Sequence, residues 1–234
     1  MNINNYYSND GDVIRFSRAQ SSTFAKDVAN DFNPIHDTDA KRFCVPGDLL
    51  FALVLTQYGL SEKMNFTFAG MVNDTTNLKF STSDNTIKLA DQNDKLYLAA
   101  EHQGANSTDT VLITSFIQSY VEFSGHNFPH ILVPLMAEHG VMINPDRPLV
   151  MYQGMSFELY SLDLKMPKLE LVDTYLEVIK KRGNVTLSFN LTEDGKLVGQ
   201  GEKKMILSNL RSYEKDKVDG MIDLYASFKS KATA

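Results

Sequence analysis

The chain has 234 residues, 43% hydrophobic and 22% charged, which suits a globular protein of one large domain or two domains of about 100–120 residues. Its net charge of −6 argues against non-specific nucleic-acid binding, and its single cysteine, Cys44, excludes an internal disulfide and fits a reducing compartment. No run approaches the ~18 apolar residues of a membrane-spanning helix, and the N-terminus lacks signal-peptide features, so we expect a cytoplasmic protein with neither membrane nor nucleic-acid partners.

The first predicted helix covers residues 21–32, with the sequence SSTFAKDVANDF. Phe24, Val28 and Phe32 are spaced four residues apart and form one apolar stripe on a helix. Its first three residues are serine or threonine, which can cap a helix start. The dipeptide Asn33-Pro34 ends it, because the residue before proline is disfavoured in the α conformation.

A second helix is predicted within residues 45–60, VPGDLLFALVLTQYGL. Pro46 lies near its start and Gly59 at its end, which is the usual asymmetry of helix termini. Apolar residues occupy nearly every side of this helix, and a helix of that kind is buried.

The pattern then changes to runs rich in β-forming residues, separated by Asp, Asn and Gly turns. Residues 95–104, KLYLAAEHQG, and residues 109–123, DTVLITSFIQSYVEF, are the clearest predicted strands. The first half therefore reads as a short helix, a buried helix and antiparallel strands.

The second half repeats this order. Residues 127–143, NFPHILVPLMAEHGVMI, are a second apolar helix candidate that Pro134 kinks or restarts, and strands follow, with an Asp194-Gly195 hairpin turn. A unit of about 100 residues that occurs twice indicates internal duplication. A helical tail with Val218 and Ile222 on one stripe ends the chain.

The polar run NDFNPIHDTDAKRF, residues 30–43, holds the main candidate site. Asp31, Asn33 and His36 fall within six residues around a proline. Carboxylate and imidazole have different pKa values, about 3.9 and 6.5, and so can act as a proton-transfer pair on one water. The alternative is a capped helix end followed by a tight turn.

Residues Asp31 to His36 match the Asp-x-Asn-Pro-[aliphatic]-His signature of the MaoC-like, (R)-specific enoyl-CoA hydratase family. The sequence resembles this family most specifically over residues 16–60, where a short helix precedes the motif and a buried helix with an N-terminal glycine follows it. It departs from the family at Ala29-Asn30, where Ser/Thr-Gly is usual, and at Pro46-Gly47, where His-Gly is frequent.

The resemblance implies an α+β double hotdog, with two tandem units that are each an antiparallel sheet wrapped around a long apolar helix. The units would be residues 12–123, which carry the motif, and 124–214, which lack it, followed by a C-terminal helical tail, 215–234. A homodimer is a further expectation.

The implied activity is reversible hydration of an enoyl thioester to the (R)-3-hydroxyacyl thioester. Asp31 would activate the water, His36 would hold it and relay its proton, and the backbone N–H of Gly47 would stabilise the oxyanion, while Asn33 positions the turn. No cofactor is implied, since the substrate, an acyl-CoA or acyl-carrier-protein thioester, itself carries coenzyme A or phosphopantetheine.

Several other readings of these residues remain open. A metal site at His36, Asp37 and Asp39 lacks a further ligand at a recognised spacing. Cys44 as a nucleophile sits in an apolar context that usually makes thiols inert. At the level of function, the alternatives are a non-catalytic acyl-thioester-binding hotdog protein and a structural or regulatory protein in which the motif is only a turn.

Overall fold

The computed structural model describes residues 1–125 and 127–232. Its strands are β1 (Ser8–Asp10), β2 (Val13–Arg15), β3 (Leu60–Phe68), β4 (Leu78–Ser83), β5 (Thr86–Asp91), β6 (Leu96–Ser107), β7 (Val141–Met142), β8 (Val150–Leu159), β9 (Lys168–Ile179), β10 (Arg182–Glu193), β11 (Lys196–Ser208) and β12 (Arg211–Ser212).

The described residues form fewer helices than strands, and most of the helices are short. They are the 3-10 turns η1 (Ile3–Asn5) and η3 (Pro34–His36), the π-helical turn η2 (Phe24–Val28), and the α-helices α1 (Arg18–Thr23), α2 (Gly47–Tyr58), α3 (Thr110–Gly125), α4 (Asn127–His130), α5 (Leu132–Glu138) and α6 (Lys215–Ala232). Among the described residues, no helix combines the length and the apolar character needed to cross a membrane.

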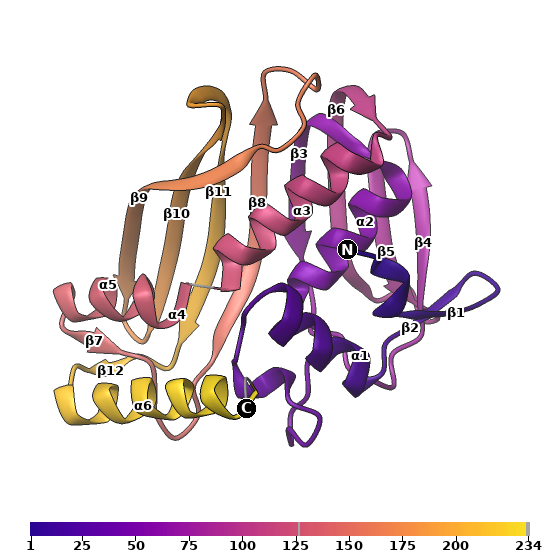
Figure 1. Ribbon diagram of the computed structural model, residues 1–234. Helices are drawn as coiled ribbons and strands as arrows, with labels where there is room; N and C mark the ends of the chain where they lie inside the picture. The colour runs from indigo at the N-terminus through magenta and orange to yellow at the C-terminus, as the bar shows by residue number, and fades with distance from the viewer. Residues whose placement is uncertain (126, 233–234) are drawn as a thin grey trace.

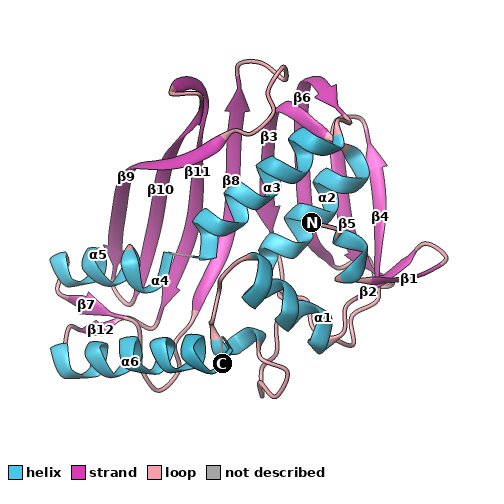
Figure 2. Cartoon of the chain, viewed as in Figure 1, coloured by secondary structure: helices cyan, strands magenta, loops and turns pink. Residues whose placement is uncertain are grey.

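One large antiparallel sheet organises the molecule (Figure 1). Its ten strands follow the order β1-β2-β4-β5-β6-β3-β8-β11-β10-β9. Strands from the first and second halves of the chain meet where β3 pairs with β8, in a register that sets Phe66 opposite Met155. The helices gather on one face of this sheet (Figure 2). The predicted α+β class is therefore confirmed.

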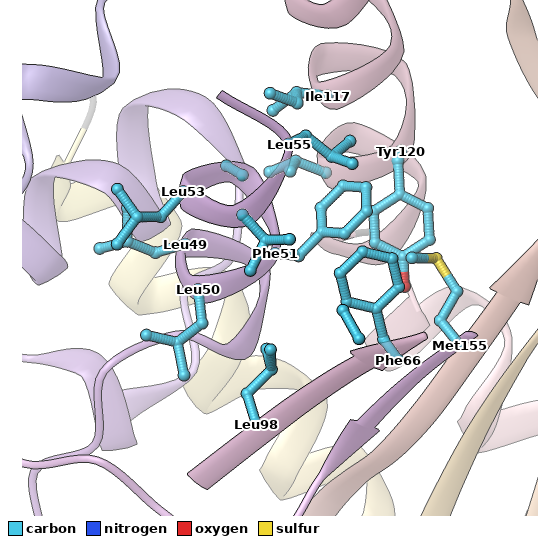
Figure 3. Packing of buried hydrophobic residues seen from close by; sticks show 14 of the residues in the cluster. Leu49, Leu50, Phe51, Leu53, Leu55, Phe66, Leu98, Ile117, Tyr120 and Met155 are labelled. Carbon is cyan, nitrogen blue, oxygen red and sulfur yellow. The ribbon is translucent and has the colours of Figure 1, made fainter. Parts of the chain in front are cut away.

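Helix α2 lies in the centre of the larger core. Its residues from Asp48 to Leu55 are all buried, as the apolar character on every side predicted. The Phe51 ring centroid lies 4.7 Å from that of Tyr120 in α3 and 5.1 Å from that of Phe66 in β3. Figure 3 shows these three rings close to Met155 of β8. Side chains from both halves of the chain therefore surround α2.

The first predicted helix is displaced in the structure. It begins at Arg18, three residues before the predicted start, because Ser17 caps it: Ser17 Oγ accepts a hydrogen bond from Gln20 N, and Gln20 Oε1 accepts one from Ser17 N. The helix widens into the π turn η2 and ends before the motif. The caps predicted at residues 21–23 are wrong.

The strand predicted at residues 109–123 is also wrong, since this segment forms α3. Its β-branched and aromatic residues favour a strand locally, but Leu112, Phe116 and Tyr120 recur every fourth residue and bury one helical face. The carboxylate of Asp109 caps the start by accepting hydrogen bonds from Val111 N and Leu112 N.

Consequently, the long apolar helix of the second half is α3 and not residues 127–143. That segment contains two short helices, α4 and α5, and the strand β7. Pro134 falls in the first turn of α5, where a helix does not need its N–H, so the expected restart near this proline is confirmed.

Candidate active site

The motif brings its carboxylate and its imidazole together. Asp31 Oδ2 lies 3.6 Å from His36 Nε2, and the two side chains are 27% and 12% exposed. This separation exceeds a hydrogen bond, so each group keeps capacity for a third partner such as a water. The other carboxylate oxygen, Oδ1, accepts a hydrogen bond from Asn33 N at 2.9 Å.

A backbone carbonyl fixes the orientation of His36. His36 Nδ1 lies 2.7 Å from Cys44 O, and because a carbonyl only accepts, Nδ1 carries the proton in this contact. In the neutral ring, Nε2 is then an acceptor, and it faces Asp31. The histidine is thus held ready to take a proton at Nε2.

Asn33 stabilises the turn that joins the two groups. Its Oδ1 accepts a hydrogen bond from Ile35 N at 3.2 Å, and His36 N donates to Asn33 O at 3.0 Å. The amide therefore caps η3, the short turn that carries His36. Its catalytic role stays a prediction.

The departure at Ala29-Asn30 is accommodated by the backbone. Asn30 has φ of +51°, in the left-handed region where glycine is favoured and asparagine is tolerated. Asp31 N donates to Ala25 O at 2.8 Å, which closes the loop after η2. Asn30 can thus take the place of the usual glycine before the motif carboxylate.

A cavity of about 380 Å³ opens beside the motif. The motif residues, Gly47 at the start of α2 and Tyr152 of β8 line it, together with residues of β11 and α6. Pockets for small molecules have volumes of roughly 300–1,000 Å³. Asp31, Asn33, His36 and Gly47 therefore line one cavity, and its volume falls in this range.

Gly47 occupies a place where a side chain does not fit. A Cβ at this position would lie 2.8 Å from Tyr152 Cδ1 and 3.3 Å from Phe68 Cε1. Gly47 is the first residue of α2, and the first N–H groups of a helix have no partner within the helix. The position suits a backbone donor beside the positive end of the helix dipole.

A series of buried, hydrogen-bonded polar side chains lines the same cavity and was not predicted from the sequence. Ser124 of α3 donates to Asp48 Oδ2 at 2.5 Å, and Lys203 of β11 donates to Ser124 Oγ. Burial raises the pKa of the Asp48 carboxyl, which nearby Lys203 partly offsets. Burial lowers the pKa of the Lys203 ammonium, which Asp48 partly offsets.

Two features of the sequence could have indicated these buried polar residues. Asp48 is the only charged residue in the otherwise apolar run of α2. Lys203 shares a strand face with Met205 and Leu207, which are buried, since alternate residues of a strand point the same way. A charge on an apolar face indicates a paired or functional group.

Two tyrosines, Tyr152 of β8 and Tyr225 of α6, line the cavity. The Tyr120 and Tyr152 hydroxyls hydrogen-bond to each other, and burial raises the pKa of Tyr152 well above its usual value. In α6, the Tyr225 hydroxyl accepts from Phe32 N at 3.4 Å and donates to Gly125 O at 3.5 Å. Burial raises the pKa of Tyr225 to about 12.

The structure does not favour the competing chemistry near the motif. Burial raises the pKa of Cys44 to about 12, and its thiol donates to Val45 O at 3.3 Å, so it is a poor nucleophile. Asp37 pairs with Lys26 at 2.7 Å. Within the part of the chain that the structure describes, no group of three His, Cys, Asp or Glu is placed to hold a metal ion.

Several solved structures are similar to this chain over most of both chains. A putative thioesterase II from Thermobifida fusca is 8% identical with a TM-score of 0.46, over 87% of this chain and 95% of that one. A MaoC-like dehydratase is 9% identical with a TM-score of 0.44, over 87% and 98%. The acyl-CoA thioesterase II TesB2 from Mycobacterium marinum is 9% identical with a TM-score of 0.40, over 90% and 96%.

No curated protein sequence matches this chain. A family model described as "Protein of unknown function (DUF3581)" matches residues 1–216, which include the motif, the start of α2 and Lys203. The chain therefore belongs to the DUF3581 family.

Proposed function

We propose that this protein is a hydratase or dehydratase of enoyl and (R)-3-hydroxyacyl thioesters. The observation that carries the proposal is the approach of Asp31 Oδ2 to His36 Nε2, at 3.6 Å, on the wall of a cavity that Gly47 also lines. The motif that resembles the MaoC-like family thus has a spatial arrangement that suits a shared water.

The proposed reaction adds water across the C2–C3 double bond. The water oxygen bonds to C3 as the water gives a proton to the Asp31–His36 pair, and the electron pair moves onto the thioester oxygen. The Gly47 N–H donates to that developing oxyanion. The Asp31–His36 pair then gives a proton to C2, which returns the pair to its starting state, the carbonyl reforms, and the product carries the hydroxyl at C3.

Each group has a separate task in this scheme. The Asp31 carboxylate is an acceptor for the water proton, and its second oxygen is held by Asn33 N. His36 Nε2 can accept from the same water because Nδ1 is engaged by Cys44 O. A positioned acid or base of this kind contributes about 10²–10⁴-fold to rate.

A direct assay tests the proposal. Purified protein is mixed with crotonyl-CoA, and the loss of enoyl absorbance is followed for the wild type, Asp31→Asn and His36→Gln. We expect turnover by the wild type and a large loss in both variants. Asp39→Asn is the matched control, because Asp39 is exposed in the same loop and outside the cavity wall.

Other outcomes identify other functions. Release of free coenzyme A without loss of the double bond would identify thioester hydrolysis. Binding without turnover across several chain lengths would favour a non-catalytic acyl-thioester-binding protein. No binding of any acyl thioester would remove the proposal altogether.

The finer architecture belongs to this proposal too. We propose a double hotdog of two tandem units and a tail at 215–234, although the boundary between residues 123 and 124 that the sequence predicts falls inside α3. Because α3 runs unbroken from Thr110 to Gly125, the second unit would begin near Thr110 instead. Action without a cofactor, a cytoplasmic location and a homodimer stay predictions, and sedimentation of the purified protein tests the last.

A further inference from the structure

A buried polar cluster lies in the cavity beyond the proposed reacting pair. It consists of Asp48, Ser124, Asn127 and Lys203, which are 8%, 9%, 4% and 4% exposed and all line the cavity. Asp31 and His36, at 27% and 12% side-chain exposure, are more open to solvent. We call these four residues the inner polar cluster.

Two oxygen atoms of the inner polar cluster have no hydrogen-bond partner. Asp48 Oδ1 and Asn127 Oδ1 are buried, and no described residue donates to either. Buried acceptors are nearly always satisfied, because an unpaired one loses its hydration without compensation. Both residues line the cavity, but the two oxygens are closed off from it in this structure, so a group inside the cavity could supply the missing donors once either side chain rotates toward it.

The charge of the cluster limits what that group can be. Asp48 and Lys203 are bridged by Ser124, and together they carry no net charge whether the shared proton is on the ammonium or on the carboxyl. An anionic group would meet the unpaired oxygens of Asp48 and Asn127. A cationic group would meet Lys203. A neutral group that both donates and accepts matches the cluster best, and a hydroxyl is the simplest one.

The cluster is close enough to the motif to act on the same substrate. Asp31 and His36 both affect the pKa of Asp48, and Asp31 raises that of Lys203. The nucleotide of coenzyme A and a carrier protein are too large for a cavity of about 380 Å³, so a thioester held at Asp31 and His36 would have its pantetheine arm directed out toward them. The acyl chain is therefore the part of a thioester that can reach the inner polar cluster.

We propose that the inner polar cluster is a substrate subsite for a hydroxyl group on the acyl chain, so that the preferred substrates are hydroxylated acyl thioesters. The substrate hydroxyl donates to Asp48 Oδ1 or Asn127 Oδ1 and accepts from Lys203. This inference rests on the proposed action on acyl thioesters, but it concerns binding and not the reaction.

The test compares pairs of 2-enoyl-CoA ligands of increasing chain length. In each pair, one member ends in a hydroxyl and the other in a methyl group in its place. Binding is measured by isothermal titration to the Asp31→Asn variant, which prevents turnover, and kcat/KM is measured on the wild type. At one chain length we expect the hydroxylated ligand to be preferred by about ten-fold or more.

Variants locate the preference in the cluster. Asn127→Leu keeps the side-chain size and removes the unpaired oxygen, so it should bring the two ligands of the pair closer in affinity. Ser124→Ala is a second variant that breaks the bridge between Asp48 and Lys203. Met221→Leu, a change elsewhere in the cavity wall, should leave the ratio of the two affinities unchanged.

The results separate this inference from the proposed function. Equal affinity for both ligands at every chain length overturns the subsite, even if the wild type hydrates them. A preference for the hydroxylated ligand without turnover supports the subsite and counts against the hydratase. An equal loss for both ligands in Asn127→Leu would assign Asn127 to the pantetheine arm and overturn the subsite as stated.

Discussion

At the scale of single residues, a backbone contact determines what the motif can do. His36 Nδ1 donates a hydrogen bond to Cys44 O, so the other ring nitrogen, Nε2, faces Asp31 and is free to accept. The carbonyl belongs to the chain just before α2, eight residues after the histidine. The geometry of the motif therefore depends on the contact between His36 and the later residue Cys44, and not only on the five-residue spacing of Asp31 and His36.

The first prediction concerns the coupling of Asp31 and His36. Asp31→Asn and His36→Gln should each lower kcat by about 10²–10⁴-fold. Because both groups act on one water, the double variant should lose much less than the product of the two single losses. Steady-state kinetics on an enoyl-CoA measure this, and fully multiplicative losses would show that the two residues act independently.

The second prediction concerns the thiol of Cys44. Burial raises its pKa from 9.0 to about 12. The folded protein therefore keeps the proton at a pH where the unfolded chain has lost part of it, and at pH 8 we expect about a thousand-fold less thiolate than for an unperturbed thiol. Alkylation by iodoacetamide should be correspondingly slow in the native state and normal in urea. Rapid native labelling would contradict this.

At the scale of elements, the first residue of α2, Gly47, packs so closely against β8 that a side chain would not fit there. The Tyr152 ring occupies the space that a side chain at position 47 would need, and it stacks on Phe68 with ring centroids 4.2 Å apart. The start of α2 is thus placed by contacts with the sheet, and its N–H groups are directed by the same contacts.

The third prediction follows from this packing. Gly47→Ala should destabilise the protein by about 1–3 kcal/mol, because the new methyl displaces an aromatic ring, and it should lower kcat by shifting the donor. Gly220→Ala is the control. A Cβ there meets nothing within 4 Å and the position lies inside α6, so this change should stabilise by up to about 1 kcal/mol. Urea unfolding measures both.

At the scale of the whole molecule, the C-terminal helix α6 meets the motif segment around Phe32 at the candidate site. Tyr225 of α6 hydrogen-bonds to Phe32, 193 positions earlier in the chain, and its ring packs edge-to-face on Phe32 with centroids 6.3 Å apart. Figure 1 shows the end of α6 beside the N-terminal segment. The tail helix thus forms part of the cavity wall and supports the motif loop.

The fourth prediction tests this long-range contact. Tyr225→Phe keeps the ring and removes the hydroxyl, so it should cost about 0.5–1.5 kcal/mol of stability. It should raise KM more than it lowers kcat, since it loosens the wall and leaves Asp31 and His36 in place. Tyr160→Phe, at an exposed tyrosine, serves as the control. Unchanged stability and KM would show that the hydroxyl contacts contribute nothing.

Features that depend on contacts between near neighbours in the chain could be predicted without coordinates. The turn from Asp31 to His36 is short and held by a proline, so its two side chains stay close in any fold that keeps the turn. The burial of α2 was likewise predictable, because a helix that is apolar on every side must be covered by protein.

The remaining features depend on contacts between segments that are distant in the chain. Residues 109–123 carry both strand-forming residues and a helical repeat, and the core that forms around Phe116 and Tyr120 selected the helix. Asp48, Ser124 and Lys203 are more than seventy positions apart, so nothing local indicates that they meet. Their pairing exists because α2, α3 and β11 pack together, and packing between distant segments is the one property that local patterns do not encode.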